Sequence, residues 1–237
     1  FTVLELVMVI GVLSVLLAII LPTIKTVRAA ALRRQAAAEA TALAQAAIRY
    51  KTEYGFWPGQ VQLSSSSASD GTVKLNADTH SDVKNDGYTL PCIAYGNRDF
   101  LTNLKSEDNK GNDISHRILR LYDDNTDGRL LYQAFSTVGD SPSVPYPSNP
   151  LNPKAIPFLP LQNEHDHRTV DYRDPWNQSY VLIMGLNPHE VFTYELKDSV
   201  GAVIATHSVS NHIAFAFSRG SPADRGTNYI YSAGVTP

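Results

Sequence analysis

The stretch that decides the fold opens the chain: "FTVLELVMVIGVLSVLLAIILP", residues 1–22. It carries no charge from Leu6 to Leu21. At about 1.5 Å per residue, a helix over residues 1–21 nearly crosses a hydrocarbon layer about 30 Å thick. Glu5 is the exception, because a carboxylate in hydrocarbon costs about 2.5 kcal/mol or more and usually has a partner. We therefore expect a membrane helix in which Glu5 has a specific function.

Two other interpretations of this stretch are less favoured. A cleavable secretory signal would use the alanines at 29–31 as its cleavage site, but no basic region precedes the apolar run. A buried core helix would carry a polar stripe, and none interrupts the run. Lys and Arg that follow the run would place the large domain in the cytoplasm, unless a basic leader was removed before Phe1.

The helix is expected to continue past Pro22 to Tyr54. Residues 23–54 are rich in alanine and contain neither glycine nor proline. Apolar residues recur there at steps of three and four, and this stripe should pack on the rest of the chain: Leu32, Ala36, Leu43, Ala47, Tyr50 and Tyr54. Pro22 has no N–H for the carbonyl of Ala18, so it predicts a weak point between the two halves.

Composition limits the remaining possibilities. The 237 residues are 43% hydrophobic and 18% charged, which suits one well-packed domain with an appendage. Residues 1–54 hold six Lys or Arg and three Glu, a net charge of +3. Because the whole chain has a net charge of −3, residues 55–237 carry a net charge of −6. The sequence contains no cluster of basic and aromatic residues of the kind that would predict nucleic-acid binding. The single cysteine, Cys92, excludes an internal disulfide and reads as a buried apolar residue.

After the helix the pattern predicts an α+β fold, with a long helix packed on a small antiparallel sheet with large loops. Residues 60–95 read as an insertion with a serine-rich loop, residues 116–123 as a short helix, and the proline-rich residues 140–162 as an extended loop. Five stretches alternate with the period of strands: "YVLIMGL", "EVFTYEL", "GAVIAT", "HIAFAFS" and "NYIYSA".

Three segments carry a family resemblance. Residues 1–22, with Phe1, Glu5 and Pro22, resemble the mature N-terminus of type IV pilins and of the pseudopilins of type II secretion. "IRYKTEYGFWP" at 48–58 resembles the end of the long helix in major pseudopilins. "RDPWNQSYVLI" at 173–183 resembles their D-P-W-G-x-x-Y segment, with Asn177 where glycine is usual.

The resemblance implies the pilin fold, with residues 1–54 as the helix, 1–21 as its membrane or filament core, and 55–237 as a globular head. It implies a structural subunit of a helical filament. A prepilin peptidase would cut before Phe1 and methylate the new amine, and inner-membrane machinery would then assemble the chain with copies of itself. In the filament Glu5 would pair with the amine of Phe1 on a neighbour, a registry use of buried charge. Gly11 and Pro22 would let the helix pack and stretch.

The implied location is the bacterial inner membrane before assembly and an extracellular pilus afterwards. The alternative within the family is a periplasmic pseudopilus of a type II secretion system. A third possibility, of a different class, is a membrane-anchored binding protein whose head captures a ligand.

Metal and enzyme chemistry have weaker signals. "DDNTDG" at 123–128 places Asp123, Asn125 and Asp127 at alternate positions, as calcium loops do, with the carbonyl of Arg129 as a further ligand. Because the twelfth position is Ala134, this is a partial calcium loop or an ordinary turn, and both interpretations stay open. No nucleophile, phosphate-loop or dinucleotide motif occurs, so we expect no enzyme and no certain cofactor.

Overall fold

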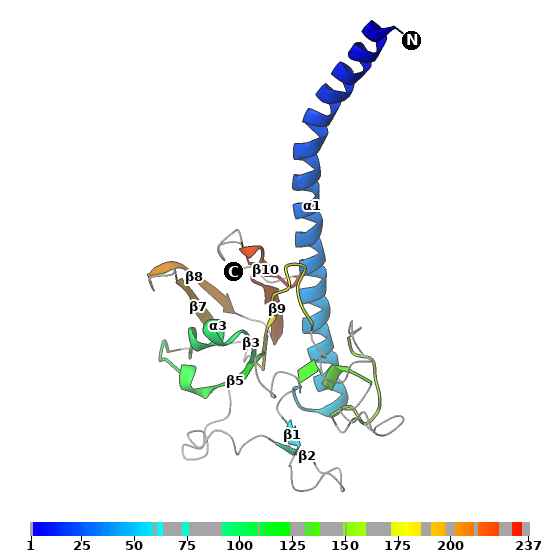
Figure 1. The fold of residues 1–237 in the computed structure, drawn as a ribbon. Helices are drawn as coiled ribbons and strands as arrows, with labels where there is room; N and C mark the ends of the chain where they lie inside the picture. Colours follow the sequence, from blue (N-terminus) through cyan, green and yellow to red (C-terminus); the bar gives the residue numbers. More distant parts are fainter. Residues whose placement is uncertain are drawn as a thin grey trace.

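The computed structural model describes residues 2–58, 61–63, 73–75, 92–108, 110–123, 131–132, 134–137, 149, 151–159, 172–185, 191–197, 202–210, 213–222 and 229–233. Structural statements below refer to these residues. The fold is α+β, as the sequence predicts, with one long helix beside the sheets (Figure 1). The expected small antiparallel sheet is confirmed only in part, because the sheet beside the helix is mixed and contains one parallel pair of strands.

Helix α1 runs without interruption from Val3 to Tyr54, 52 residues or about 78 Å. Its start is capped by Thr2, and its end by Gly55, whose φ of 81° is in the left-handed region that favours glycine. The N–H of Gly55 donates to the carbonyl of Lys51 at 2.8 Å. The expected single helix is confirmed, and it continues through position 22. Figure 1 shows a smooth curve in the N-terminal half of the helix and no break.

The main sheet has five strands in the order β10-β9-β6-β3-β5. These are β3 (Cys92–Gly96), β5 (Ile118–Tyr122), β6 (Val181–Met184), β9 (Ala214–Ser218) and β10 (Ile230–Tyr231). All neighbours are antiparallel except β3 and β5, which are parallel. A parallel pair needs a crossover, and the segment between these two strands supplies it with helix α3 (Arg98–Thr102), β4 (Leu104–Glu107) and the short η1 (Ser115–Arg117).

A second sheet has three antiparallel strands in the order β4-β7-β8, with β7 at Val191–Lys197 and β8 at Val203–Ser210. A separate antiparallel pair joins β1 (Val61–Leu63) to β2 (Val73–Leu75). The five stretches predicted as strands are therefore confirmed as β6 to β10.

Each face of the main sheet has its own core. Because side chains alternate along a strand, Leu182 and Met184 of β6 pack with the α1 stripe, whereas Val181 and Ile183 pack with α3 and the three-stranded sheet. The α1 stripe is confirmed: its central residues are fully buried and its two ends half-buried, and α1 lies along β9 and β10. The main sheet is thus the middle layer, and it holds the second half of α1 in place.

Two expectations about the middle of the chain are wrong. Residues 116–123 form η1 and strand β5 instead of a helix, because Ile118 faces one core and Leu119 and Leu121 face the other. Residues 92–95, which the sequence assigned to an insertion, lie in β3 (Cys92–Gly96) between β5 and β6, and all five residues of this strand are buried.

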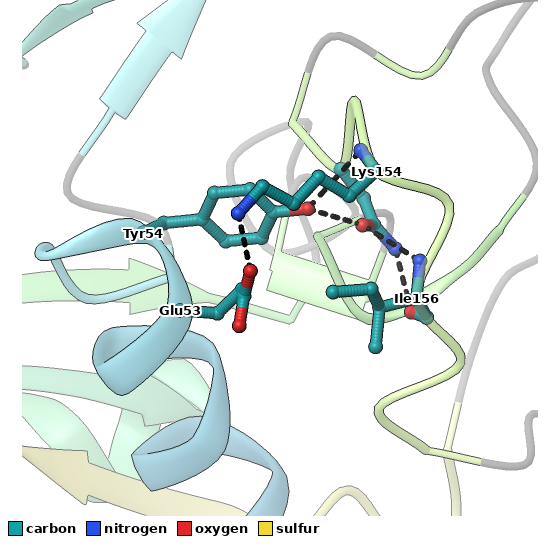
Figure 2. Close-up of polar contacts among 5 residues, drawn as sticks. Glu53, Tyr54, Lys154 and Ile156 are labelled. Carbon is teal, nitrogen blue, oxygen red and sulfur yellow. Dashed lines mark hydrogen bonds and ion pairs between the residues drawn. The ribbon is translucent and has the colours of Figure 1, made fainter.

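The last turn of α1 is tied to the proline-rich segment, whose described part, 149 and 151–159, contains neither helix nor strand. Figure 2 shows the contacts: the Tyr54 hydroxyl donates to Oδ1 of Asn152 at 2.6 Å, and Nζ of Lys154 bonds the carboxylate of Glu53. Asn152 in turn bonds both backbone groups of Ile156. The expected extended loop is therefore confirmed over these residues, and it fixes the end of the helix.

Candidate functional site

The N-terminal half of α1 projects away from the sheets (Figure 1), and the side chains described there are exposed. Exposed fractions of its large apolar side chains between Val3 and Leu17 run from 49% at Leu16 to 81% at Val3. Ile24 and Val27 are also exposed. The first buried residue of the helix, among those whose side chains are described, is Ala36. Among the residues that the structure describes, nothing covers the large apolar side chains of this half of the helix.

The apolar surface surrounds the helix instead of forming one stripe. Exposed apolar residues are consecutive at 6–10 and again at 15–17, and consecutive residues of a helix point about 100° apart. A helix that is apolar all round belongs inside a protein core or a bilayer. Within the described part of the chain, α1 alone is long and apolar enough to cross a membrane. The structure is therefore consistent with membrane anchoring through α1.

Glu5 takes part in a capping box at the start of this helix. Its Oε2 accepts a hydrogen bond from the backbone N–H of Thr2 at 2.8 Å, and its own N–H donates to Oγ1 of Thr2 at 3.4 Å. The box satisfies two backbone N–H groups that a helix start otherwise leaves to water. Glu5 therefore has a partner inside its own chain, which the sequence analysis missed. The pattern T-x-x-E before an apolar run could have revealed it.

The other predicted assembly residues are placed as follows. Gly11 lies mid-helix, where a Cβ would meet nothing within 4 Å, so packing inside this chain does not require glycine there. Glycine in a helix costs about 1 kcal/mol relative to alanine. Pro22 lies in the helix, but its side chain is outside the described residues, and so is Phe1. The expected pairing of Glu5 with an amine of Phe1 stays a prediction.

The predicted calcium loop falls largely outside the described residues. Asp123 is described, and its N–H donates to the carbonyl of Gly96 at 3.0 Å, which extends the pairing of β3 and β5. Asn125, Asp127 and Arg129 are not described. Among the residues that are, no group of three or more His, Cys, Asp or Glu is placed to hold a metal ion.

The segment at 173–183 contains a buried carboxylate, Asp174, that organises the turn before β6. Its Oδ1 accepts from the N–H groups of Trp176 and Gln178 at 3.0 and 2.8 Å. Its Oδ2 accepts from the hydroxyl of Ser218 at 2.6 Å, and that hydroxyl oxygen accepts from the N–H of Gly220. Asp174 thereby joins the turn to the end of β9, a structural role that the sequence analysis did not assign.

The backbone angle of Asn177 explains why asparagine can stand where the resembled segment has glycine. Its φ is 63°, in the left-handed region that glycine and asparagine adopt most easily. The substitution therefore preserves the turn.

Comparison of the chain with protein-family models, with curated proteins and with solved structures gave no match. What the fold itself defines is an α+β protein with an N-terminal apolar helix suited to a membrane.

Proposed function

We propose that the protein is a structural subunit of a helical, type IV pilus-like extracellular filament, held in the bacterial inner membrane before assembly. The observation that carries the proposal is the apolar surface of α1 from Val3 to Leu17, continued by Ile24 and Val27, whose large apolar side chains are exposed in the isolated chain. Large exposed patches of this kind mark interaction or membrane surfaces. A helix that leaves the membrane must cover the same surface with copies of itself.

Glu5 favours a filament over a lone membrane anchor. The capping box and the helix dipole favour a carboxylate at that position, and glutamine would keep the hydrogen bond while losing the charge. That local gain is the same in an anchor and in a filament, whereas only a filament also gains registry when the carboxylate meets an amine of a neighbouring Phe1. Gly11 also fits a filament, because among the described residues nothing lies within 4 Å of where its Cβ would stand.

The pseudopilus of a type II secretion system is the second candidate within the family. The long proline-rich and serine-rich segments favour surface display, which suits an extracellular filament better than a recycling piston. A membrane-anchored binding protein remains the candidate from another class.

The test uses three variants that separate the cap from the charge. Glu5→Gln keeps the hydrogen bond to the N–H of Thr2 but removes the charge, and Glu5→Ala removes both. Thr2→Ala keeps the charge and removes the hydroxyl that accepts from Glu5, at a cost of about 0.5–2 kcal/mol in helix stability. Each variant is produced in cells with the assembly machinery. Filaments are counted by electron microscopy, and the N-terminal peptide is examined by mass spectrometry.

We expect Thr2→Ala to assemble and both Glu5 variants to fail, because an unpaired buried charge costs about 3–5 kcal/mol per subunit contact. Wild-type filaments should contain a processed, methylated Phe1. Normal filaments from Glu5→Gln would show that Glu5 is only a cap and would refute the charge pair. Monomers alone from the wild type would favour the anchored binding protein.

A further inference from the structure

Strand β8 is the longest strand that the structure describes, and it lies at one edge of the three-stranded sheet. Within the described part of the chain its partner is β7, on the inner side. In an edge strand every second residue points its backbone N–H and C=O groups outward, where another strand can pair with them. Side chains of β8 also face solvent: Val203 is 50% exposed, and Thr206 and Ser208 are exposed. Both the backbone and the side chains of β8 are therefore placed to meet a partner.

The sequence of β8 lacks the features that usually protect an edge strand from pairing. Such features are short length, charged side chains, proline and a bulge in the strand. Residues 203–210 contain no Asp, Glu, Lys, Arg or Pro. The register shift in the β7–β8 ladder lies at its end, where Lys197 pairs with Val203. Four of the eight residues are β-branched and favour a strand, namely Val203, Ile204, Thr206 and Val209.

The opposite edge of the same sheet, β4, is protected in the usual way. It has only four residues, and two of them, Lys105 and Glu107, are charged and exposed. The ammonium group of Lys105 lies 3.7 Å from the carboxylate of Glu195 on β7. Glu107 also forms an isolated bridge with Asp113, which covers the end of that edge. Of the two edges of this sheet, β8 is therefore the one suited to pairing with another strand.

We propose that β8 pairs in antiparallel orientation with β8 of a second copy of this chain, so that the two three-stranded sheets form one continuous sheet. About a twofold axis, an edge strand is its own complement, because the outward N–H and C=O groups of each copy meet those of the other. The absence of Asp, Glu, Lys and Arg from residues 203–210 favours a second copy, since identical strands then bring no like charges together. Thr206 and Ser208 lie on one face, so the hydroxyl groups of the two copies gather there.

The symmetry of this pair limits where it can act in the proposed filament, and this step alone rests on the proposed function. The twofold axis is perpendicular to the three-stranded sheet. That sheet packs on one face of the main sheet and α1 lies along the other face, so the axis is also roughly perpendicular to α1. The α1 helices of the paired copies therefore point in opposite directions. Because all chains of one helical filament point the same way, the β8 pair would join two oppositely directed filaments side by side.

The test measures dimerisation of the full chain in detergent by analytical ultracentrifugation. Thr206→Lys with Ser208→Lys places two cations on the edge of each copy, at side chains that are exposed in the single chain. The matched control, Thr52→Lys with Thr102→Lys, adds the same charge at exposed positions of α1 and α3. Hydrogen–deuterium exchange of residues 203–210, measured by mass spectrometry, reports whether the backbone of β8 is covered. Near-UV circular dichroism checks the fold of each variant.

We expect the parent to dimerise, and the β8 double variant to dimerise about tenfold more weakly at low salt and less so at high salt. The control variant should match the parent, and exchange over residues 203–210 should slow as the parent dimer forms. No parent dimer, or equal dimerisation of the parent and the β8 variant, would overturn the pair. Slow exchange in the monomer would also overturn it, because the edge would then be covered by its own chain.

Electron microscopy separates this proposal from the proposed filament. The β8 variant should still form single filaments, because it leaves the apolar surface of α1 and Glu5 unchanged, but it should lose side-by-side bundles. Bundles as frequent in the β8 variant as in the parent would overturn the contact between filaments. Dimers of the parent without any filaments would refute the proposed function and leave the β8 pair standing.

Discussion

Replacing Asp174 by alanine should be among the most damaging single changes outside α1. The substitution removes the acceptor of three hydrogen bonds, at 3.0, 2.8 and 2.6 Å, from Trp176, Gln178 and Ser218. Each buried donor left without a partner costs about 1–3 kcal/mol. Ser218 is fully buried and takes the full penalty, whereas Trp176 and Gln178 are half-buried and recover part of it from water. The expected loss is about 3–5 kcal/mol, a large part of the typical stability of a domain.

Asp174→Asn should cost less, about 1–2 kcal/mol. Its Oδ1 can still accept from both backbone groups, but its amide donates to Ser218, whose own hydroxyl proton then lacks an acceptor. Asn177→Gly is the matched control in the same turn, because glycine adopts a φ of 63° without strain.

Thermal unfolding of the full chain in detergent, followed by near-UV circular dichroism, would measure these effects. A change of 1 kcal/mol shifts the midpoint of a domain of this size by about 2–4 °C, so a loss of about 3–5 kcal/mol in Asp174→Ala should lower it by about 6–20 °C. A shift no larger than that of Asn177→Gly would refute the assigned role of Asp174.

Two further changes test the core and its tyrosines. Leu43→Ala should destabilise the fold by about 3–5 kcal/mol in denaturant titrations, since Leu43 is fully buried, whereas Ile48→Ala on the exposed side of α1 should cost less than about 1 kcal/mol. Burial raises the pKa of Tyr172 and of Tyr229 from 10.0 to about 12. The folded state therefore holds these protons longer, so the stability that they contribute is complete below about pH 10 and is lost as the pH rises toward about 12. Tyrosinate absorbance and circular dichroism should change together in that range, and full ionisation with the fold intact would contradict the burial.

Much of the fold could be predicted from the sequence wherever apolar residues recur with a single period, either that of a helix or that of a strand. The α1 stripe has the helical period along one side, and β6 to β10 alternate as strands that contribute to two different cores. Strand β5 was misread because "ILRLY" has apolar residues on both faces, a pattern that a helix segment also shows. Its Arg120 is only half-buried and donates to the carbonyls of Leu101 and Leu104, contacts that only the folded crossover supplies.

The candidate site was predictable in its location and not in its details. The length and apolarity of residues 1–22 sufficed to select the exposed half of α1. The capping box of Glu5 with Thr2 was not predicted, although the spacing of the two residues encodes it. Asp174 could not be singled out, because its role depends on Ser218, which is 44 residues away in the sequence.

The geometry of α1 also makes it a long lever arm. About 50 Å of helix separates Ala36, the first buried position, from Val3. A rotation of about 10° at Ala36 would move Thr2 sideways by about 9 Å, nearly the diameter of a helix. The burial of α1 against β9 and the bonds of Tyr54 and Glu53 hold that angle, so small rearrangements where the helix meets the sheets are magnified at its N-terminus.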